Sequence, residues 1–375
     1  MPKFSFYRLM IACALLSWSC SFQDTTAPVT TTETPASTEQ KPDTQEASLC
    51  SGPIFQDSMR TFTFKGRTWE KNGSTMTLQD GSANQPVRIG VLSDIKEDSP
   101  ENIANLKNFV QWFTEKDVQL ILVAGDTGET QAQIENALSV VTEAQVPVFA
   151  IIGNREGRHT FNQAMDALHK RHPNMFNLNE VRRIHTAEVD ILSLPGYFNS
   201  RFIHAEDGCQ YQASDLALLQ SMVDATKQQP TLLVSHGGPK QQGPLALDYT
   251  STGDNVGDPE LARFMAETNI AFGVFGNIHE AGGKATNLAG DSVIAPNTLA
   301  SSLYLNPGAA DAVRWSMNDK SESVGMAAIL TLQGGKASYD VLRISLPGAK
   351  KKAEPKVKAK GKEKAKAKGK GKAKH

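Results

Sequence analysis

The stretch "VRIGVLSDIK", residues 87–96, decides the fold, because it reads as a short apolar β-strand that ends in an acid. A helical pattern follows at 100–117, and the same alternation of strand and helix recurs along the chain. The later apolar runs are "LILVAGD" at 120–126, "PVFAIIGN" at 147–154, "PTLLVSH" at 230–236 and "IAFGVFGNIH" at 270–279. Strands that alternate with helices at these lengths predict an α/β fold with buried sheets.

Two regions with β patterns flank this alternating part. Residues 59–78 alternate aromatic or β-branched with polar residues around "KNGS", which predicts a hairpin with an Asn-Gly turn. After residue 300, the pieces "SLYLN", "MAAILTL" and "ASYDVLRISL" show strand patterns with few helical signals. We therefore predict one domain over residues 51–348.

The N-terminus, residues 1–20, has the pattern of an export signal. Lys3 and Arg8 precede the apolar run "LMIACALL", which is shorter than the roughly 20 residues that a membrane-spanning helix needs. The run ends in "SWSC" and resembles a bacterial lipoprotein signal, in which Cys20 becomes the lipidated residue. A plain secretory signal cleaved near Ser19 is the alternative. The sequence thus predicts an exported protein of the bacterial cell envelope, held at the membrane by a lipid anchor.

Two segments have too little apolar material to form a core. Residues 21–50, rich in Thr, Pro, Glu and Gln, predict a disordered linker, and residues 349–375 predict a disordered Lys-rich tail. From Lys350 onward thirteen lysines stand against two glutamates, so the net charge of −1 conceals an acidic body. Such a run binds polyanions without sequence preference, here lipid headgroups, acidic polysaccharide or DNA. A tail that only improves solubility is the alternative.

Cysteine usage agrees with an oxidising compartment. Cys13 is lost with the signal and Cys20 carries the lipid, which leaves Cys50 and Cys209. Two remaining thiols in an exported chain predict a disulfide between the start of the folded part and its middle. The only feature that suggests a place at the rim of a site for the segment "FIHAEDGCQ", 202–210, is its proximity to Cys209.

The predicted strands share one feature, which is that each ends in a cluster of metal-ligand side chains. The clusters are "SDIK", "AGDTGE", "GNRE", "SHGGP" and "GNIH". Ligands bind in open α/β sheets beyond the carboxyl ends of the strands, so these side chains should converge. They are Asp94, Asp126, Asn154, His236 and His279. Carboxylate, amide and imidazole ligands together suit Mn, Fe or Zn.

The order of these clusters resembles the calcineurin-like metallophosphoesterases, whose pattern reads D-x-H, G-D-x-x-D, G-N-H-D/E, H and G-H-x-H. The resemblance covers Val87 to Gly308 and includes "HGGP" and "YLNPGAA". It implies two central β-sheets flanked by helices, in a metallophosphoesterase-like βαβ sandwich. It also implies a metal site that hydrolyses phosphoesters, in which an aspartate bridges two ions.

The resemblance assigns a role to each matching residue. Asp94 and His279 are expected at the first metal, and Asp126 is expected to bridge the two metals. Asn154 and His236 are expected at the second metal, with Asn277 as a further amide ligand. Glu129 stands in the last acidic position of the G-D-x-x-D motif.

The sequence departs from the family pattern at Lys96, Arg155 and Asn277, each of which replaces a histidine. A protonated lysine cannot bind a metal, and neighbouring carboxylates favour its charged form. We therefore hypothesise that Lys96, beside Asp94 and Asp126, stands in electrostatically for the first metal. A solvated loop lysine next to Glu97 and Asp98 is the alternative.

Arg155 replaces the histidine that protonates the leaving group in the family. A guanidinium keeps its proton, so Arg155 cannot act as a general acid, but it can clamp two phosphate oxygens. A surface salt bridge to Glu156 or a similar acid is the alternative. We predict one divalent ion (Mn, Fe or Zn) rather than two, and a phosphate-containing ligand. The predicted function is weak or altered phosphoester hydrolysis, and the alternative is a non-catalytic envelope lipoprotein that binds such ligands.

Overall fold

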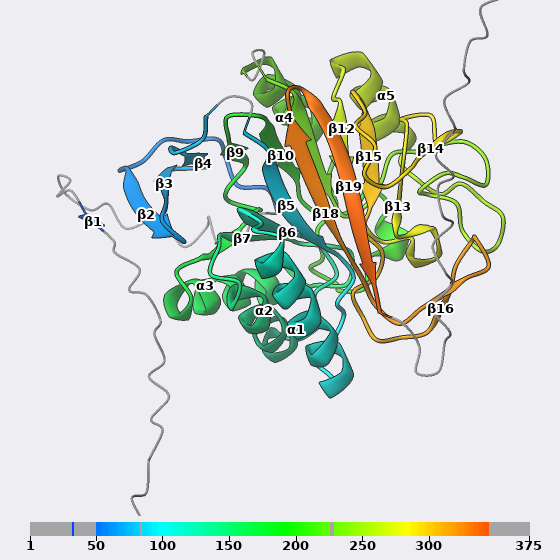
Figure 1. Cartoon of the computed structure of the whole chain (residues 1–375), viewed down its shortest axis with the longest axis horizontal. Helices are drawn as coiled ribbons and strands as arrows, with labels where there is room; N and C mark the ends of the chain where they lie inside the picture. Colours follow the sequence, from blue (N-terminus) through cyan, green and yellow to red (C-terminus); the bar gives the residue numbers. More distant parts are fainter. Residues whose placement is uncertain (1–31, 34–49, 83–84, 226–228, 345–375) are drawn as a thin grey trace, which may run out of the picture.

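The computed structural model describes residues 32–33, 50–82, 85–225 and 229–344. The predicted signal with Cys20, most of the predicted linker at 21–50 and the predicted tail at 349–375 lie outside the described residues. Figure 1 shows two sheets at the centre of the described part, with helices on both outer sides. This arrangement confirms the α/β fold class and the two central sheets flanked by helices.

The first sheet contains the stretch that opened the sequence analysis. Its strand order is β19-β18-β5-β6-β7-β8. The strands are β5 (Val87–Leu92), β6 (Leu120–Ala124), β7 (Val148–Ile151), β8 (Met175–Asn177), β18 (Met326–Gln333) and β19 (Lys336–Arg343). From β5 to β8 neighbouring strands are parallel, whereas β18 is antiparallel to both β5 and β19. The parallel strands are apolar along their length because both faces of the sheet are covered.

The second sheet has the strand order β1-β2-β3-β4-β9-β10-β11-β12-β15-β13-β14. Its first part consists of β1 (Thr32–Glu33), β2 (Arg60–Phe64), β3 (Arg67–Asn72), β4 (Thr75–Leu78) and β9 (Arg183–His185). Its second part consists of β10 (Asp190–Leu194), β11 (Thr231–Ser235), β12 (Phe272–Val274), β15 (Leu303–Asn306), β13 (Lys284–Thr286) and β14 (Val293–Ile294). A separate two-stranded sheet pairs β16 (Trp315–Ser316) with β17 (Glu322–Ser323).

The N-terminal strands differ from the prediction in two ways. The predicted Asn-Gly turn joins β3 to β4, but Lys65 and Gly66, both at positive φ, make a second turn between β2 and β3. The region is therefore a three-stranded meander rather than one hairpin. Residues 32–33, which we assigned to the disordered linker, form β1 on the open edge of β2, because that edge offers unpaired backbone groups.

Helices cover the outer faces of the two sheets. They are α1 (Pro100–Glu115), α2 (Gln131–Thr142), α3 (Arg158–Arg171), α4 (Ala213–Ala225) and α5 (Pro259–Thr268), with short 3-10 turns η2 (Ser200–Phe202) and η3 (His279–Ala281). Local sequence explains where several of them begin. The Thr130 side chain and Gln133 form a capping box at the start of α2, and Asp258 caps α5 immediately before a proline.

Three apolar clusters hold these layers together. The cluster between the sheets takes Ile89 and Leu122 from the first sheet and Val234 from the second. Ile121 and Val123, which point to the other face of β6, pack with the cluster under α1, α2 and α3. A third cluster joins the second sheet to α4 and α5. The layered core therefore leaves the loops at the strand ends as the place for polar side chains.

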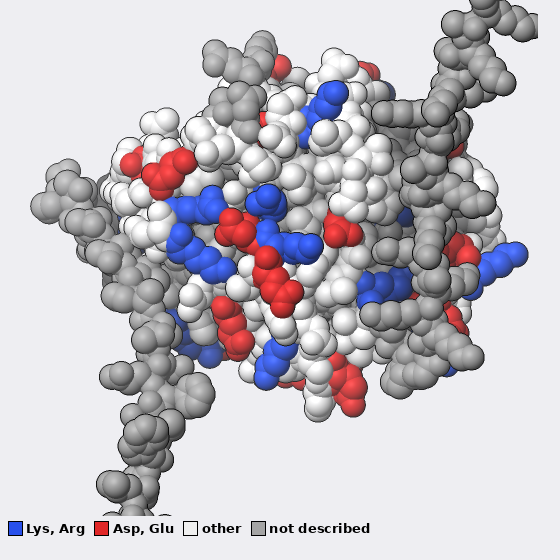
Figure 2. Space-filling view, viewed as in Figure 1, with Lys and Arg blue, Asp and Glu red and all other residues white. Residues whose placement is uncertain are grey.

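The described surface carries charges of both signs. Figure 2 shows Lys and Arg side chains next to Asp and Glu side chains on the face that it displays, rather than one large patch of a single sign. Within the described residues, no helix has the length and apolar character that crossing a bilayer requires.

Candidate metal and phosphate site

The carboxyl ends of strands from both sheets meet at one place. Asp94 follows β5, Asp126 follows β6, and His236 follows β11 of the second sheet. One ligand atom of each lies within 4.8 Å of the others, and all three side chains are buried. Residues far apart in sequence are thus gathered as the strand-end pattern predicts.

Asp126, His236 and Asn154 form the first half of the site. The Nδ1 of His236 donates to the carbonyl oxygen of Ala124 at 2.8 Å, since a carbonyl can only accept. This bond directs Nε2 toward the Asn154 Oδ1 at 2.8 Å and an Asp126 carboxylate oxygen at 3.2 Å. Asp126 Oδ1 also accepts the backbone N–H groups of Asn154 and Arg155, at 3.0 and 3.1 Å.

Asp94, His279 and Asn277 form the second half. His279 Nε2 donates to one Asp94 oxygen at 3.0 Å, while the backbone N–H of Asn277 donates to the other at 3.0 Å. The side-chain amide of Asn277 does not point at Asp94, because its Nδ2 donates to the hydroxyl of Tyr197 at 2.9 Å. The predicted ligands Asn277 and His279 therefore have partners of their own beside the group of Asp94, Asp126 and His236.

The backbone of the site is strained. Asp94, Lys96, Asp126 and Asn277 all adopt left-handed φ angles, between 55° and 68°. Non-glycine residues rarely take this conformation, and it concentrates at functional sites where surrounding structure enforces it. Gly276 permits close packing of the loops, because a Cβ there would lie 1.8 Å from the hydroxyl oxygen of Ser93.

The buried groups perturb each other's pKa values. Burial opposes ionisation of Asp94, but the charge and hydrogen bond of His279 and the charges of His236 and Lys96 outweigh burial and lower its pKa. Burial likewise opposes the charge on His236, yet Asp126, its hydrogen bond and Asp94 raise the pKa of His236 to about 10. The metal-free site therefore holds an imidazolium between carboxylates.

Glu156 is a site residue that the sequence analysis treated only as a partner for Arg155. It is fully buried and accepts backbone N–H groups of Thr127 and Gly153, the latter at 2.9 Å. Burial and the nearby charge of Asp126 raise the pKa of Glu156 to about 7. Glu156 thus joins the loop that carries Asp126 to the loop that carries Asn154.

Lys96 is not the solvated loop lysine that we considered as the alternative, and its ammonium pairs with Asp311 rather than with Glu97 or Asp98. Its Nζ forms an ion pair with Asp311 Oδ2 at 2.7 Å, and the side chains are only 11% and 0% exposed. The ammonium also lies 4.3 Å from the ring centroid of Trp315, whose Nε1 donates to Asp311 at 2.8 Å. The opposite charge on Asp311 holds the ammonium there, so Lys96 acts on Asp94 only through its charge.

Trp315 links this ion pair to the metal-site residues. Its ring centroid lies 4.1 Å from that of His279, which in turn holds Asp94. Neither Asp311 nor Trp315 belongs to a strand-end cluster. Both come from the segment that follows β15, and the sequence analysis missed them.

Arg155 likewise has a partner other than the adjacent acid. Its Nη2 pairs with Glu129 Oε1 at 2.5 Å, whereas Glu156 is fully buried. The carboxylate of Glu129 also lies 3.6 Å from His204 Nδ1. The salt bridge that we considered as the alternative is present, but its acid is Glu129. The sequence named that residue only as the last acid of its motif.

The residues present fit one divalent ion. Atoms that share an ion at about 2.0–2.2 Å lie roughly 3–4.4 Å apart, close to the spacing of the Asp94, Asp126 and His236 atoms. Two carboxylates and the Asn154 oxygen supply acceptors, and His236 Nε2, which is turned inward, becomes a fourth ligand when binding of the ion displaces its proton. The second half of the site has fewer free ligands for an ion of its own, because Lys96 pairs with Asp311 and Asn277 contacts Tyr197.

The raised pKa of His236 predicts how metal-free protein responds to pH. Because its folded pKa is about 10 and its ordinary value is 6.5, its stabilisation is complete below pH 6.5 and is lost as the pH rises to 10. We expect the Tm of chelator-treated protein to fall across this window, and Mn²⁺ to reduce the fall. If His236→Asn shows the same pH slope as the unaltered protein, His236 is not the group responsible.

Comparison with known proteins places this site in a family. The family model described as calcineurin-like phosphoesterase matches residues 87–281. No curated protein matches the chain.

Solved structures with low identity resemble the chain. GAP50, the anchor in the inner membrane complex of Plasmodium, aligns at 15% identity and a TM-score of 0.46 over 69% of this chain and 84% of its own. A dimetal phosphatase from Danio rerio aligns at 11% identity and a TM-score of 0.44 over 69% of this chain and 99% of its own. A purple acid phosphatase from yellow lupin aligns at 10% identity and a TM-score of 0.43 over 81% of this chain and 62% of its own.

Proposed function

This chain belongs to the calcineurin-like phosphoesterase family, and from that premise we propose that it is a metal-dependent phosphoester hydrolase with weak or altered activity. The observation that carries the proposal is the buried group of Asp94, Asp126 and His236, whose ligand atoms lie within 4.8 Å of one another. One divalent ion (Mn, Fe or Zn) is proposed there, with Asn154 as a further ligand. When bound, such an ion supplies Lewis-acid chemistry that polarises a phosphoryl oxygen.

Residues of the chain itself would bind and orient the phosphate. Arg155 presents planar guanidinium donors that suit two phosphate oxygens, once its pair with Glu129 opens. Tyr197 holds a proton on its hydroxyl, because burial together with the charges of Asp126 and Asp94 raises its pKa to about 12. The hydroxyl is oriented by Asn277 and can donate to an oxyanion.

The same residues explain why we propose weak turnover. Arg155 keeps its proton and cannot protonate a leaving group, which general acids in such sites accomplish for a gain of about 10²–10⁴-fold. Lys96 and Asp311 neutralise each other beside Asp94, where the family resemblance places the first metal. A hydrolase with one ion and no proton donor should be slow.

A second candidate function is that of a non-catalytic protein that binds phosphate-containing or polyanionic ligands in the same pocket. The contacts of Lys96 with Asp311 and of Asn277 with Tyr197 favour it, because both give a lost metal ligand a structural role. For the regions outside the described residues we propose export, a lipid anchor at Cys20 in the bacterial envelope, and polyanion binding by the Lys-rich tail. The composition of those segments supports this proposal.

Metal content and turnover separate the two candidates. We expect the hydrolase to bind about one equivalent of Mn²⁺ and to hydrolyse phosphomonoesters or phosphodiesters slowly when Mn²⁺ is added. Elemental analysis and p-nitrophenyl phosphate esters provide the measurements. Metal below about a tenth of an equivalent, without turnover, would remove the hydrolase and leave the binding protein.

Restoring the family histidines provides the sharper form of this test. The combined change Lys96→His, Arg155→His and Asn277→His should raise turnover by about 100-fold or more, because it restores two ligands and a proton donor. Lys107→His on the exposed face of α1 is the matched control and should change nothing. An inert triple variant that still folds would mean that the hydrolase chemistry was lost at more than these three positions.

A further inference from the structure

A loop that we call the strap, Tyr197–Cys209, crosses beside the metal site between β10 and α4. It holds Asn154 at two points. The Asn154 Nδ2 donates to the carbonyl oxygen of Phe202 at 2.6 Å, and the backbone N–H of His204 donates to the Asn154 carbonyl at 2.8 Å. With its amide nitrogen held by the strap, Asn154 turns Oδ1 toward Nε2 of His236.

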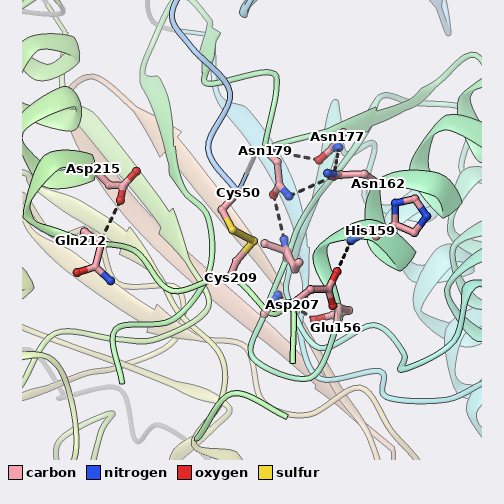
Figure 3. Close-up of a disulfide and its surroundings, with 12 residues drawn as sticks. Cys50, Glu156, His159, Asn162, Asn177, Asn179, Asp207, Cys209, Gln212 and Asp215 are labelled. Atoms are coloured by element: carbon pink, nitrogen blue, oxygen red, sulfur yellow. Dashed lines mark hydrogen bonds between the residues drawn. A yellow bond between two sulfur atoms is a disulfide. The ribbon is translucent and has the colours of Figure 1, made fainter. Parts of the chain in front are cut away.

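The strap is also fixed to the start of α3. The residue before this helix is Gly157, which has no side chain to cap the helix. The Asp207 side chain from the strap supplies an acceptor instead, and the backbone N–H of His159 donates to it at 2.9 Å. Figure 3 shows Asp207 pointing at the backbone of His159, close to the disulfide. Gly208 forms an isolated bridge with Gly157 beside this contact.

The end of the strap is covalently bound to the N-terminal part of the domain. Cys209, fully buried, forms the predicted disulfide with Cys50, with a Cα–Cα distance of 5.4 Å (Figure 3). Beyond Cys50, the N–H of Gly52 donates to the carbonyl of Asn179 at 2.6 Å, and its carbonyl accepts from the buried Arg182 at 2.8 Å. The disulfide thus ties the strap to a segment that is itself anchored in the core.

We infer that the Cys50–Cys209 disulfide positions Asn154 as an ion ligand through the strap, so that the ion affinity of the site depends on the redox state of these cysteines. The inference rests on the proposed ion site. Reduction breaks the S–S bond with two electrons and two protons from a dithiol, which is oxidised to a cyclic disulfide, and leaves two thiols.

The physical reason is the two-sided character of an amide. An asparagine side chain presents an acceptor oxygen on one side and a donor nitrogen on the other, and only the oxygen can bind a cation. The strap selects the oxygen by accepting from Nδ2 through the Phe202 carbonyl. Without the disulfide, the strap loses its covalent attachment next to Tyr197, whose N–H donates to the Cys209 carbonyl at 2.9 Å. Freed from that restraint, the amide can rotate and turn its nitrogen inward.

The test compares the Mn²⁺ affinity of the unaltered protein with that of Cys50→Ser/Cys209→Ser. Free Mn²⁺ is measured by electron paramagnetic resonance during a titration. We expect the Kd to rise about tenfold, since loss of an outer partner of a ligand typically costs about 10–100-fold in metal affinity. Reduction of the unaltered protein should cause the same rise, and reoxidation should reverse it.

Leu332→Ala is the matched control for lost stability. Leu332 is buried and pairs with Val87, at the end of β5 opposite to Asp94. Its truncation should lower the Tm while leaving the Kd for Mn²⁺ within about twofold, because it opens a cavity far from the strap. A change in Kd that follows Tm in this variant would mean that the disulfide acts only through stability, and would overturn the inference.

His204→Pro tests the role of the strap independently if the Cys50→Ser/Cys209→Ser variant does not fold. It retains the disulfide but removes the N–H that donates to the Asn154 carbonyl, so it should weaken Mn²⁺ binding as well. If the folded variants have unchanged Kd values while the unaltered protein binds Mn²⁺, the inference about the strap is overturned but the ion site stands. An unaltered protein that binds no Mn²⁺ would overturn the ion site itself, and the inference with it.

Discussion

Asp126→Asn should lower the affinity of the protein for Mn²⁺ by at least about 100-fold, since even the loss of an outer partner of a ligand costs about 10–100-fold. The substitution keeps the shape of the side chain and an oxygen that can accept the N–H groups of Asn154 and Arg155. It removes a negative charge at the point where His236 Nε2 and the Asp94 carboxylate converge. Isothermal titration calorimetry with Mn²⁺ measures the change in affinity.

The same substitution should remove much of the pH dependence of the metal-free protein, because Asp126 is the main group that raises the pKa of His236. Glu129→Gln removes an equal charge at the rim, where its carboxylate pairs with Arg155, and serves as the control. Its affinity for Mn²⁺ should change little. If Asp126→Asn retained affinity within about threefold, the buried group would not be the ion site.

Asp311→Ala should destabilise the fold by about 3–5 kcal/mol, because it leaves the ammonium of Lys96 mostly buried without its counter-charge. It also removes the acceptor for the indole N–H of Trp315, which packs against His279. Urea unfolding monitored by circular dichroism gives the free energy of unfolding.

The paired replacement Lys96→Met/Asp311→Asn provides the comparison. It removes both charges and keeps an acceptor for Trp315, so its free energy of unfolding should lie within about 1–2 kcal/mol of that of the unaltered protein. A loss below about 1 kcal/mol in Asp311→Ala would show that Lys96 reaches water and does not depend on Asp311.

The layered fold could be predicted because its signals are local. The stretch around Val91 is apolar and ends in Asp94, and the helical pattern that follows it at 100–117 corresponds to α1. The meander was read as a single hairpin because the turn at Lys65 and Gly66 lacks the Asn-Gly signal of the next turn. The pairing of β1 with β2 had no local signal at all.

The candidate site was predictable where one rule applied, and not elsewhere. Parallel strands bring their carboxyl ends together, which placed Asp94, Asp126 and His236 in one group. The partner of Lys96 is Asp311, which lies far along the chain in a segment without regular structure. No spacing rule connects such residues, and the sequence analysis placed Lys96 beside Asp94 and Asp126, or in solvent next to Glu97 and Asp98.

The position of β18 has a consequence for how the chain acquires its structure. Strand β5 needs β18 as its neighbour, yet these two strands lie near opposite ends of the folded region. Pairings so distant in sequence have high contact order and form late, and until then a nascent chain exposes an open hydrophobic edge that is prone to aggregation. Fragments that end before β18 leave this edge open permanently, so loss of the C-terminal strands should be as harmful as damage to the ligands themselves.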